Sequence, residues 1–74
     1  MKPFTDLSDA IEAIKAYNGK PEDFLLPISD EMNDPTGFTM AILGDLMLSR
    51  GWIPNGFEQK DGYRVYKYRA MELP

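Results

Sequence analysis

The chain has 74 residues, of which 43% are hydrophobic, and it carries a net charge of −4 at neutral pH. This length predicts one small domain over residues 1–74, and the hydrophobic content is typical of globular proteins rather than disordered ones. Cysteine and histidine are both absent, which excludes disulfides, thiolate catalysis, imidazole general bases and the commonest zinc ligands.

The sequence also bears on location. No apolar run approaches the roughly 18 residues needed to cross a membrane. Acids and prolines interrupt the N-terminal segment, where a signal peptide needs a continuous apolar core. We therefore expect a cytoplasmic protein with no membrane partner. No cofactor motif is present, so no cofactor is predicted.

The first predicted element is a helix over residues 6–17. Thr5 is the expected N-cap, and Asn18-Gly19 is expected to end the helix in a left-handed conformation. One apolar stripe recurs at three- and four-residue spacing and predicts that a single side faces the core; it comprises Leu7, Ala10, Ile11, Ile14 and Tyr17.

The segment between the helices contains mixed signals. Residues 21–24 favour a short helical turn, because proline suits a first helical position. Residues 25–28 favour an extended edge segment, because Pro27 keeps the residue before it out of the helical region. A polar loop then leads to Asp34-Pro35, which we expect to cap and begin the second helix.

The second predicted helix covers residues 38–50. Apolar residues occupy nearly every angle of its 3.6-residue period, and the few exceptions include Asp45. A helix that is apolar almost all round is expected to be buried on several sides. It is therefore predicted to be the core helix of the domain.

The C-terminal part predicts an antiparallel hairpin. Short extended pieces at residues 52–53 and 57–59 flank a turn or bulge signal, Asp61-Gly62 is the expected hairpin turn, and residues 63–69 alternate with period two. The fold class is thus α+β, with two main helices followed by a β-hairpin. This order is also winged-helix-like.

The acidic residues of the segment 22–34 form the first candidate site. The segment has five acids and no base: Glu22, Asp23, Asp30, Glu31 and Asp34. Such a cluster repels a phosphate backbone and attracts a protein with a basic surface. The simpler interpretation is a solvated loop that keeps the protein soluble.

The basic hairpin forms the alternative site. Bases and aromatic residues are interleaved there in a pattern that can contact nucleic acid; the candidates are Arg64, Tyr66, Lys67, Tyr68 and Arg69. The same residues are also ordinary strand formers. The preceding helix lacks the basic face that a recognition helix needs, which makes nucleic acid an unfavourable partner.

Two further interpretations of the acids are weak. A calcium loop over Asp30, Met32 and Asp34 lacks the glycine and the closing glutamate of the motif. Catalysis by the paired carboxylates of Asp30 and Asp34 has nothing that positions a substrate.

The sequence therefore predicts a small acidic, non-enzymatic module that binds a protein, as an inhibitor or regulator. The apolar excess of the second helix also suggests a homodimer. Size, acidity and the lack of a catalytic motif are similar to those of small phage and mobile-element accessory proteins, a resemblance of composition alone.

Overall fold

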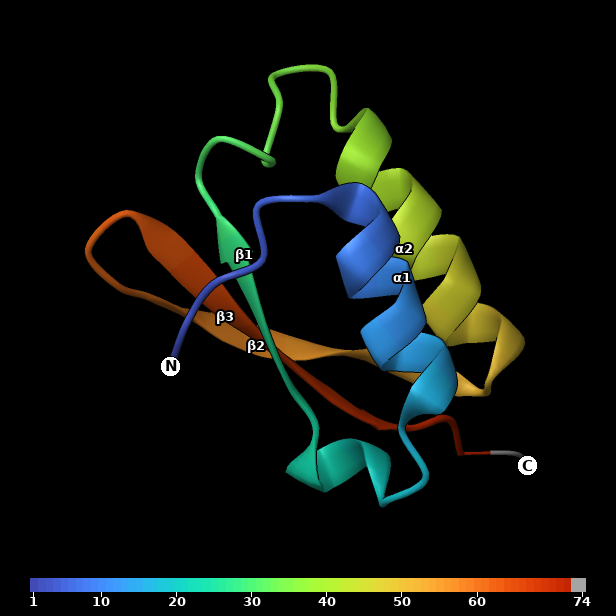
Figure 1. Ribbon diagram of the computed structural model, residues 1–74. Coiled ribbons are helices and arrows are strands. Elements are labelled where there is room, and N and C mark those ends of the chain that lie inside the picture. The colour runs from blue at the N-terminus through green and yellow to red at the C-terminus, as the bar shows by residue number, and fades with distance from the viewer. Residues whose placement is uncertain (73–74) are drawn as a thin grey trace.

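The protein is described over residues 1–72 by a computed structural model, and residues 73–74 of the predicted single domain lie outside this description. Two helices and a three-stranded antiparallel sheet confirm the predicted α+β class. The elements, shown in Figure 1, are α1 (Leu7–Ala16), the 3₁₀ helix η1 (Pro21–Asp23), β1 (Leu25–Ser29), α2 (Phe38–Ser49), β2 (Trp52–Gln59) and β3 (Tyr63–Ala70). Within residues 1–72, no helix is long and apolar enough to cross a membrane.

The sheet has the strand order β1-β3-β2, so the last strand lies in the middle. Tyr66 of β3 is paired with Leu26 on one side and with Phe57 on the other. The edge position predicted for residues 25–28 is confirmed, and an edge is where a strand tolerates proline. Phe4 extends this edge, because its backbone N–H donates to the carbonyl of Pro27 over 2.9 Å.

Helix α1 begins one residue later than expected and is capped differently. The Asp6 carboxylate accepts a hydrogen bond from the backbone N–H of Ser8 over 2.7 Å, so Asp6, and not Thr5, is the N-cap. The predicted left-handed stop is also wrong, because Gly19 has no positive φ. Gly19 instead allows a close approach, since a Cβ there would lie 2.4 Å from the hydroxyl oxygen of Tyr17.

Helix α2 begins later than the Asp34-Pro35 signal predicted. Its N-cap is Gly37, whose φ of 73° places it in the left-handed region that glycine adopts without strain. Pro35 therefore lies outside the helix. Asp34 still contributes, because its carboxylate accepts a hydrogen bond from the backbone N–H of Thr39 over 3.4 Å.

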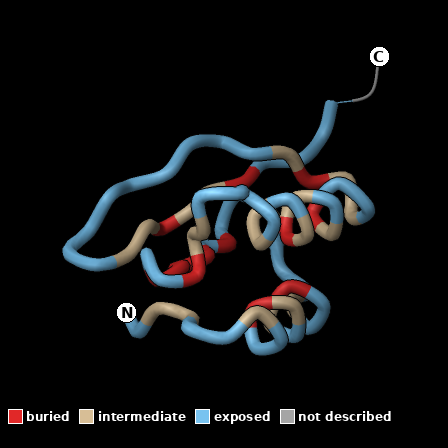
Figure 2. The backbone as a smooth tube through the Cα atoms, turned by 90° about the horizontal axis from the view of Figure 1, so that it is seen from above, coloured by how far each residue is buried: buried red, intermediate tan, exposed pale blue. Residues whose placement is uncertain are grey.

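The expectation that α2 is buried on several sides is wrong. Leu43 and Met47 are 0% and 1% exposed, whereas Phe38 and Leu48 are 65% and 49% exposed. Figure 2 shows both helices with buried residues on one side and exposed ones on the other. The two helices cover one face of a small sheet, and this two-layer arrangement leaves no element to cover the outer side of α2.

The hairpin forms as predicted, and β2 runs through the Pro54-Asn55-Gly56 signal as one bent strand with a bulge. The helix and hairpin also keep a winged-helix-like order. A helix-turn-helix places two helices in immediate succession before the hairpin, whereas within residues 1–72 the segment before α2 consists of turns and β1. The likeness is therefore one of element order alone.

An aromatic cluster closes the end of the core near η1. The ring centroids of Phe24 and Trp52 are 5.3 Å apart, and those of Trp52 and Tyr68 are 6.4 Å apart. Tyr68 is 4% exposed. Burial favours the neutral phenol, and it raises the pKa of Tyr68 to about 12.

Tyr68 provides a test of this packing by alkaline titration. The folded protein holds the Tyr68 proton more tightly than the unfolded chain does, so this stabilisation is complete below about pH 10 and is lost as the pH rises toward about 12. We expect phenolate absorbance to show one tyrosine that ionises near pH 12, together with unfolding. The late step should disappear in Tyr68→Phe; a late step that persists in this variant would contradict the assignment.

Candidate functional site

The outer side of α2 is an apolar stripe in contact with solvent. It is formed by Phe38, Ala41, Ile42 and Leu48, which are exposed or half-buried and, together with Asp45, follow three- to four-residue spacing along the helix. We call these four residues the α2 stripe. Asp45 is exposed within it and is its one charged neighbour on the same side of the helix. An exposed apolar strip of this kind, with one acidic residue within it, is typical of an interaction surface.

The acidic residues 22–34 do not form one loop, because β1 lies between them. Glu22 and Asp23 belong to η1 before this strand, and Asp30, Glu31 and Asp34 follow it. Figure 1 shows the two groups at opposite ends of β1. The predicted acidic surface is therefore divided into two separate acidic groups.

Glu22 has a structural contact of its own. Its carboxylate accepts a hydrogen bond from the backbone N–H of Ala70 over 3.1 Å, and this bond lowers the pKa of Glu22. The contact joins η1 to the end of β3. The Glu22 carboxylate is thus engaged in a contact within the domain, and Asp23 lies beside it in the same short helix.

Asp34 lies at the other end of β1, next to the start of α2. Its carboxylate accepts hydrogen bonds from the hydroxyl of Thr36 and from the backbone N–H of Thr39, and these bonds lower the pKa of Asp34, the Thr36 bond most of all. Asp34 is therefore ionised at neutral pH. It places a fixed negative charge beside Phe38, the first residue of the α2 stripe.

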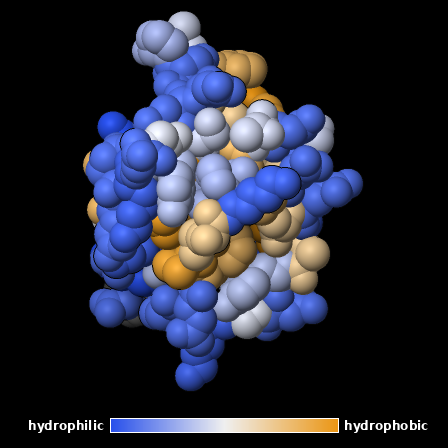
Figure 3. All heavy atoms as spheres, turned by 60° about the vertical axis from the view of Figure 1, so that its left-hand side comes forward, coloured by the Kyte–Doolittle hydropathy of each residue, from blue (hydrophilic) through white to orange (hydrophobic). Residues whose placement is uncertain are grey.

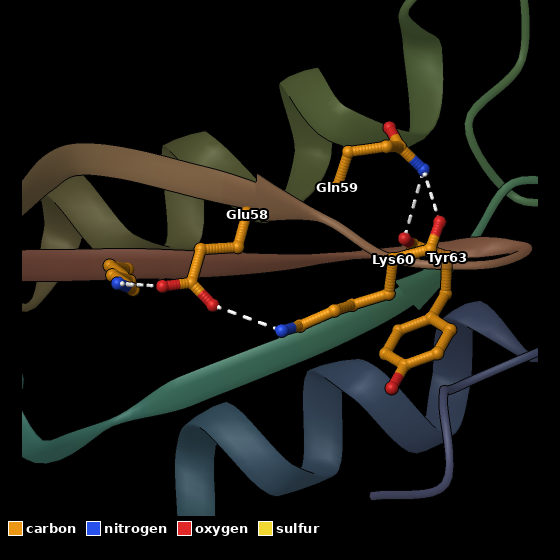
Figure 4. A network of polar contacts seen from close by, with 5 residues as sticks. Glu58, Gln59, Lys60 and Tyr63 are labelled. Carbon is orange, nitrogen blue, oxygen red and sulfur yellow. Dashed lines mark hydrogen bonds and ion pairs between the residues drawn. The ribbon is translucent and has the colours of Figure 1, made fainter.

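The basic residues of the hairpin are divided between the two faces of the sheet. On one face the Lys67 ammonium lies 2.7 Å and the Lys60 ammonium 3.3 Å from the carboxylate of Glu58. Figure 4 shows Lys60 reaching toward Glu58. Hydrogen bonds from both lysines, with Lys67 the stronger influence, lower the pKa of Glu58. This face thus pairs its lysines with an acid.

The other hairpin candidates are not gathered on one surface. Tyr68 lies inside the aromatic cluster and Arg69 is exposed near the end of β3. Arg64 and Tyr66 lie beside Phe57, whose ring is 5.6 Å from that of Tyr66. The rings of Tyr66 and Tyr68 thus lie near those of Phe57 and Trp52, and a continuous basic ribbon is absent from the described hairpin.

The side of the molecule opposite the helices also has apolar side chains at its surface. Figure 3 shows apolar side chains in the centre of this side with hydrophilic ones around them. Leu25 is 43% exposed and Val65 of the central strand is 5% exposed. Val65 is therefore covered, whereas Leu25 is exposed nearly as much as Leu48 of the α2 stripe, at 49%.

A polar pocket of about 330 Å³ lies between the turn after β1 and the hairpin. Its lining residues are Asp30, Asn33, Gln59 and Arg64. Asp30 thus faces this pocket while Asp34 is bonded to the start of α2, so the two carboxylates have different surroundings. Residues 1–72 contain no group of three or more acidic side chains placed to hold a metal ion.

Sequence reasoning found α2 and its apolar excess, but it placed the candidate sites on the acidic segment and the hairpin and not on the outer side of this helix. The signal was the lack of a polar face, which was interpreted as burial. The polar pocket was missed as well, because its four residues come from segments far apart in the sequence.

Comparison of the chain with protein-family models, curated proteins and solved structures gave no match.

Proposed function

We propose that the protein is a non-enzymatic binding module whose principal contact surface is the α2 stripe together with Asp34. The observation that carries this proposal is the exposure of Phe38 and Leu48, at 65% and 49%, on one side of a single helix. Leaving these side chains in water forgoes burial worth about 1.5–3 kcal/mol for each large apolar residue. A partner that covers them recovers that free energy.

The charges beside the stripe indicate the chemistry of the partner. Asp34 lies at one end and Asp45 near the middle, and no lysine or arginine occurs in residues 34–49. A partner surface with an apolar centre and nearby lysine or arginine side chains complements this arrangement. The net charge of −4 speeds the approach of such a basic surface.

A second copy of the chain fits the stripe less well. A two-fold symmetric contact centred on the stripe brings Asp45 of one chain toward Asp45 of the other, and both carry the same charge. Self-repulsion between two chains of charge −4 adds to this cost. A different protein is therefore the better occupant. Light scattering tests the alternative, because it would detect a homodimer.

The partner contact suggests how the module acts. A protein of this size without general-base histidine or nucleophilic cysteine acts by covering a surface of its target, as a small inhibitor or regulator does. The lack of cysteine agrees with a reducing cytoplasm. Accessory proteins of phages and mobile elements are one class with this composition.

We expect the double variant Phe38→Ser/Leu48→Ser to lose the partner while it stays folded. Both side chains are exposed, so circular dichroism and thermal unfolding should change little, whereas removing two apolar anchors costs about tenfold or more in affinity. Leu25→Ser is the matched control, because Leu25 is 43% exposed on the opposite side. A photo-crosslinking residue in place of Ala41 should capture the partner within the stripe.

The measurement is quantitative mass spectrometry of material recovered by each variant from the same lysate. The proposal requires a protein recovered by the unchanged chain and by Leu25→Ser but lost with the double variant, and crosslinked to position 41. Equal recovery by all three proteins would contradict it. If light scattering shows that the unchanged chain is a monomer, a second copy is excluded as the occupant of the stripe. If it shows a dimer that the double variant abolishes, the occupant is a second copy and not a different protein.

A further inference from the structure

We propose that the polar pocket beside the hairpin tip is a binding site for a carboxylate that has an N–H donor next to it, as in a peptide. This proposal is independent of the α2 stripe, because the pocket lies between the turn after β1 and the hairpin. It is carried by the geometry of Arg64. The chemistry of the three neighbouring side chains then defines the ligand.

Arg64 is held in place on two sides. Its Nε donates a hydrogen bond to the side-chain oxygen of Gln59 over 2.8 Å, and its guanidinium carbon lies 4.6 Å from the centre of the Phe57 ring. Gln59 is fixed in turn, since its amide nitrogen donates to the backbone carbonyls of Lys60 and Tyr63 over 2.9 and 3.0 Å. Figure 4 shows these two bonds at the turn. The guanidinium is thus oriented before any ligand binds.

The remaining donors of Arg64 are available. It forms no ion pair with an acid in residues 1–72. Beyond the bond to Gln59, its one other hydrogen bond there is a long one of 3.5 Å from Nη1 to the hydroxyl of Tyr66. A guanidinium has five N–H donors in a planar fork that matches a carboxylate. Most of that fork has no acceptor in the described structure.

Tyr66 and Asn33 add donors at the same place. The Tyr66 hydroxyl oxygen accepts from the Asn33 amide nitrogen over 2.8 Å as well as from Arg64. Because that oxygen accepts two bonds, its own proton is left to donate, and within residues 1–72 it has no acceptor. The Asn33 amide has a second N–H. Arginine, phenol and amide donors together favour an anion.

Asp30 narrows the choice of anion. It lines the same pocket as Arg64, yet the two side chains form no ion pair. Its negative charge opposes a doubly charged phosphate and tolerates a singly charged carboxylate held by Arg64. It also offers an acceptor to a neighbouring N–H of the ligand. A carboxylate next to a peptide N–H satisfies both charged residues, whether it is a chain terminus or an acidic side chain.

The test uses short peptides and NMR of the full chain. The probes are acetyl-Gly-Gly-Ala with a free C-terminus, the same peptide as its amide, acetyl-Gly-Glu-Gly-amide, and inorganic phosphate. We expect saturable shifts of the Arg64 Nε–H and Asn33 side-chain amide signals with a carboxylate peptide. The neutral amide peptide should bind at least about tenfold more weakly, because a charged hydrogen-bond pair is lost. The two acidic peptides decide between terminus and side chain.

Variants separate binding from folding. Arg64→Lys should lose about tenfold in affinity because its ammonium lacks the fork, while Arg69→Ala, an exposed arginine of the same strand, should leave binding unchanged. Asp30→Asn should tighten phosphate, because it removes the opposing charge. The proposal is overturned if neither acidic peptide shifts the Arg64 signal, if phosphate binds the unchanged chain more tightly than both peptides, or if Arg64→Lys retains full affinity with an intact fold.

Discussion

Leu43→Ala should lower the free energy of unfolding by about 3 kcal/mol, because truncation of a fully buried leucine loses apolar transfer energy and leaves a cavity. Leu43 is 0% exposed and packs in the core with Ile14 and Met47. A domain of 74 residues buries a smaller fraction of its surface than a larger domain does, and its free energy of unfolding is correspondingly small. We therefore expect the midpoint of thermal unfolding to fall by more than about 10 °C.

Leu48→Ala is the matched control on the same helix. Leu48 is 49% exposed, and alanine is the better helix former, so the free energy of unfolding should change by less than about 0.5 kcal/mol. Urea unfolding followed by tryptophan fluorescence measures both variants. If the two substitutions cost the same, α2 would not have the one-sided packing described above, and the assignment of its outer side as a binding surface would fail with it.

Arg50→Ala should lower the free energy of unfolding by about 2 kcal/mol, because it removes two charge-assisted hydrogen bonds and a cation–π contact. The Arg50 guanidinium donates to the backbone carbonyl of Ile14 and, over 2.7 Å, to that of Tyr17. Its central carbon also lies 4.4 Å from the centre of the Trp52 ring. The last carbonyls of a helix have no hydrogen-bond partner within it. Arg50, at the C-terminal end of α2, thus supplies donors to carbonyls at the C-terminal end of α1.

Arg50→Lys tests whether geometry or charge matters. A lysine keeps the positive charge near the C-terminal end of α1 but cannot reach two carbonyls and stack on Trp52 at once. We expect it to recover about half of the loss. Arg69→Ala, at an exposed position of β3, should change the free energy of unfolding by less than about 0.5 kcal/mol. Equal stability of Arg50→Ala and Arg69→Ala in urea unfolding would contradict this role of Arg50.

Local patterns predicted the elements well where one dominant signal was present. The three- and four-residue spacing from Leu7 to Tyr17 fixed α1, and the period of two from residue 63 onward fixed β3. The helix ends were less predictable, because competing caps lie side by side. Asp6 stands next to Thr5, and Gly37 follows shortly after Asp34-Pro35, so the spacing of residues alone does not decide which cap is used.

The candidate site was only partly predictable. The acids 22–34 were found from composition, but their division by β1 depends on pairing with β3, a partner about 40 residues away in the register. Lys67 was predicted as a nucleic-acid contact, and its pairing with Glu58 follows from the hairpin register. Contacts of this kind join residues whose spacing in the sequence carries no signal.

The sequence by itself determined the class of the protein: an α+β domain with one apolar helix and no histidine or cysteine chemistry. These features depend on residue type and short spacing, which are complete in the sequence. The tertiary structure alone decided which side of α2 is covered, how Arg50 joins the two helices, and that Arg64 meets Asp30 across a pocket. The exposed side of α2 follows from the number of elements around it, because two layers bury only one side of the helix. The contacts of Arg50 and Arg64 join residues that are far apart in the sequence.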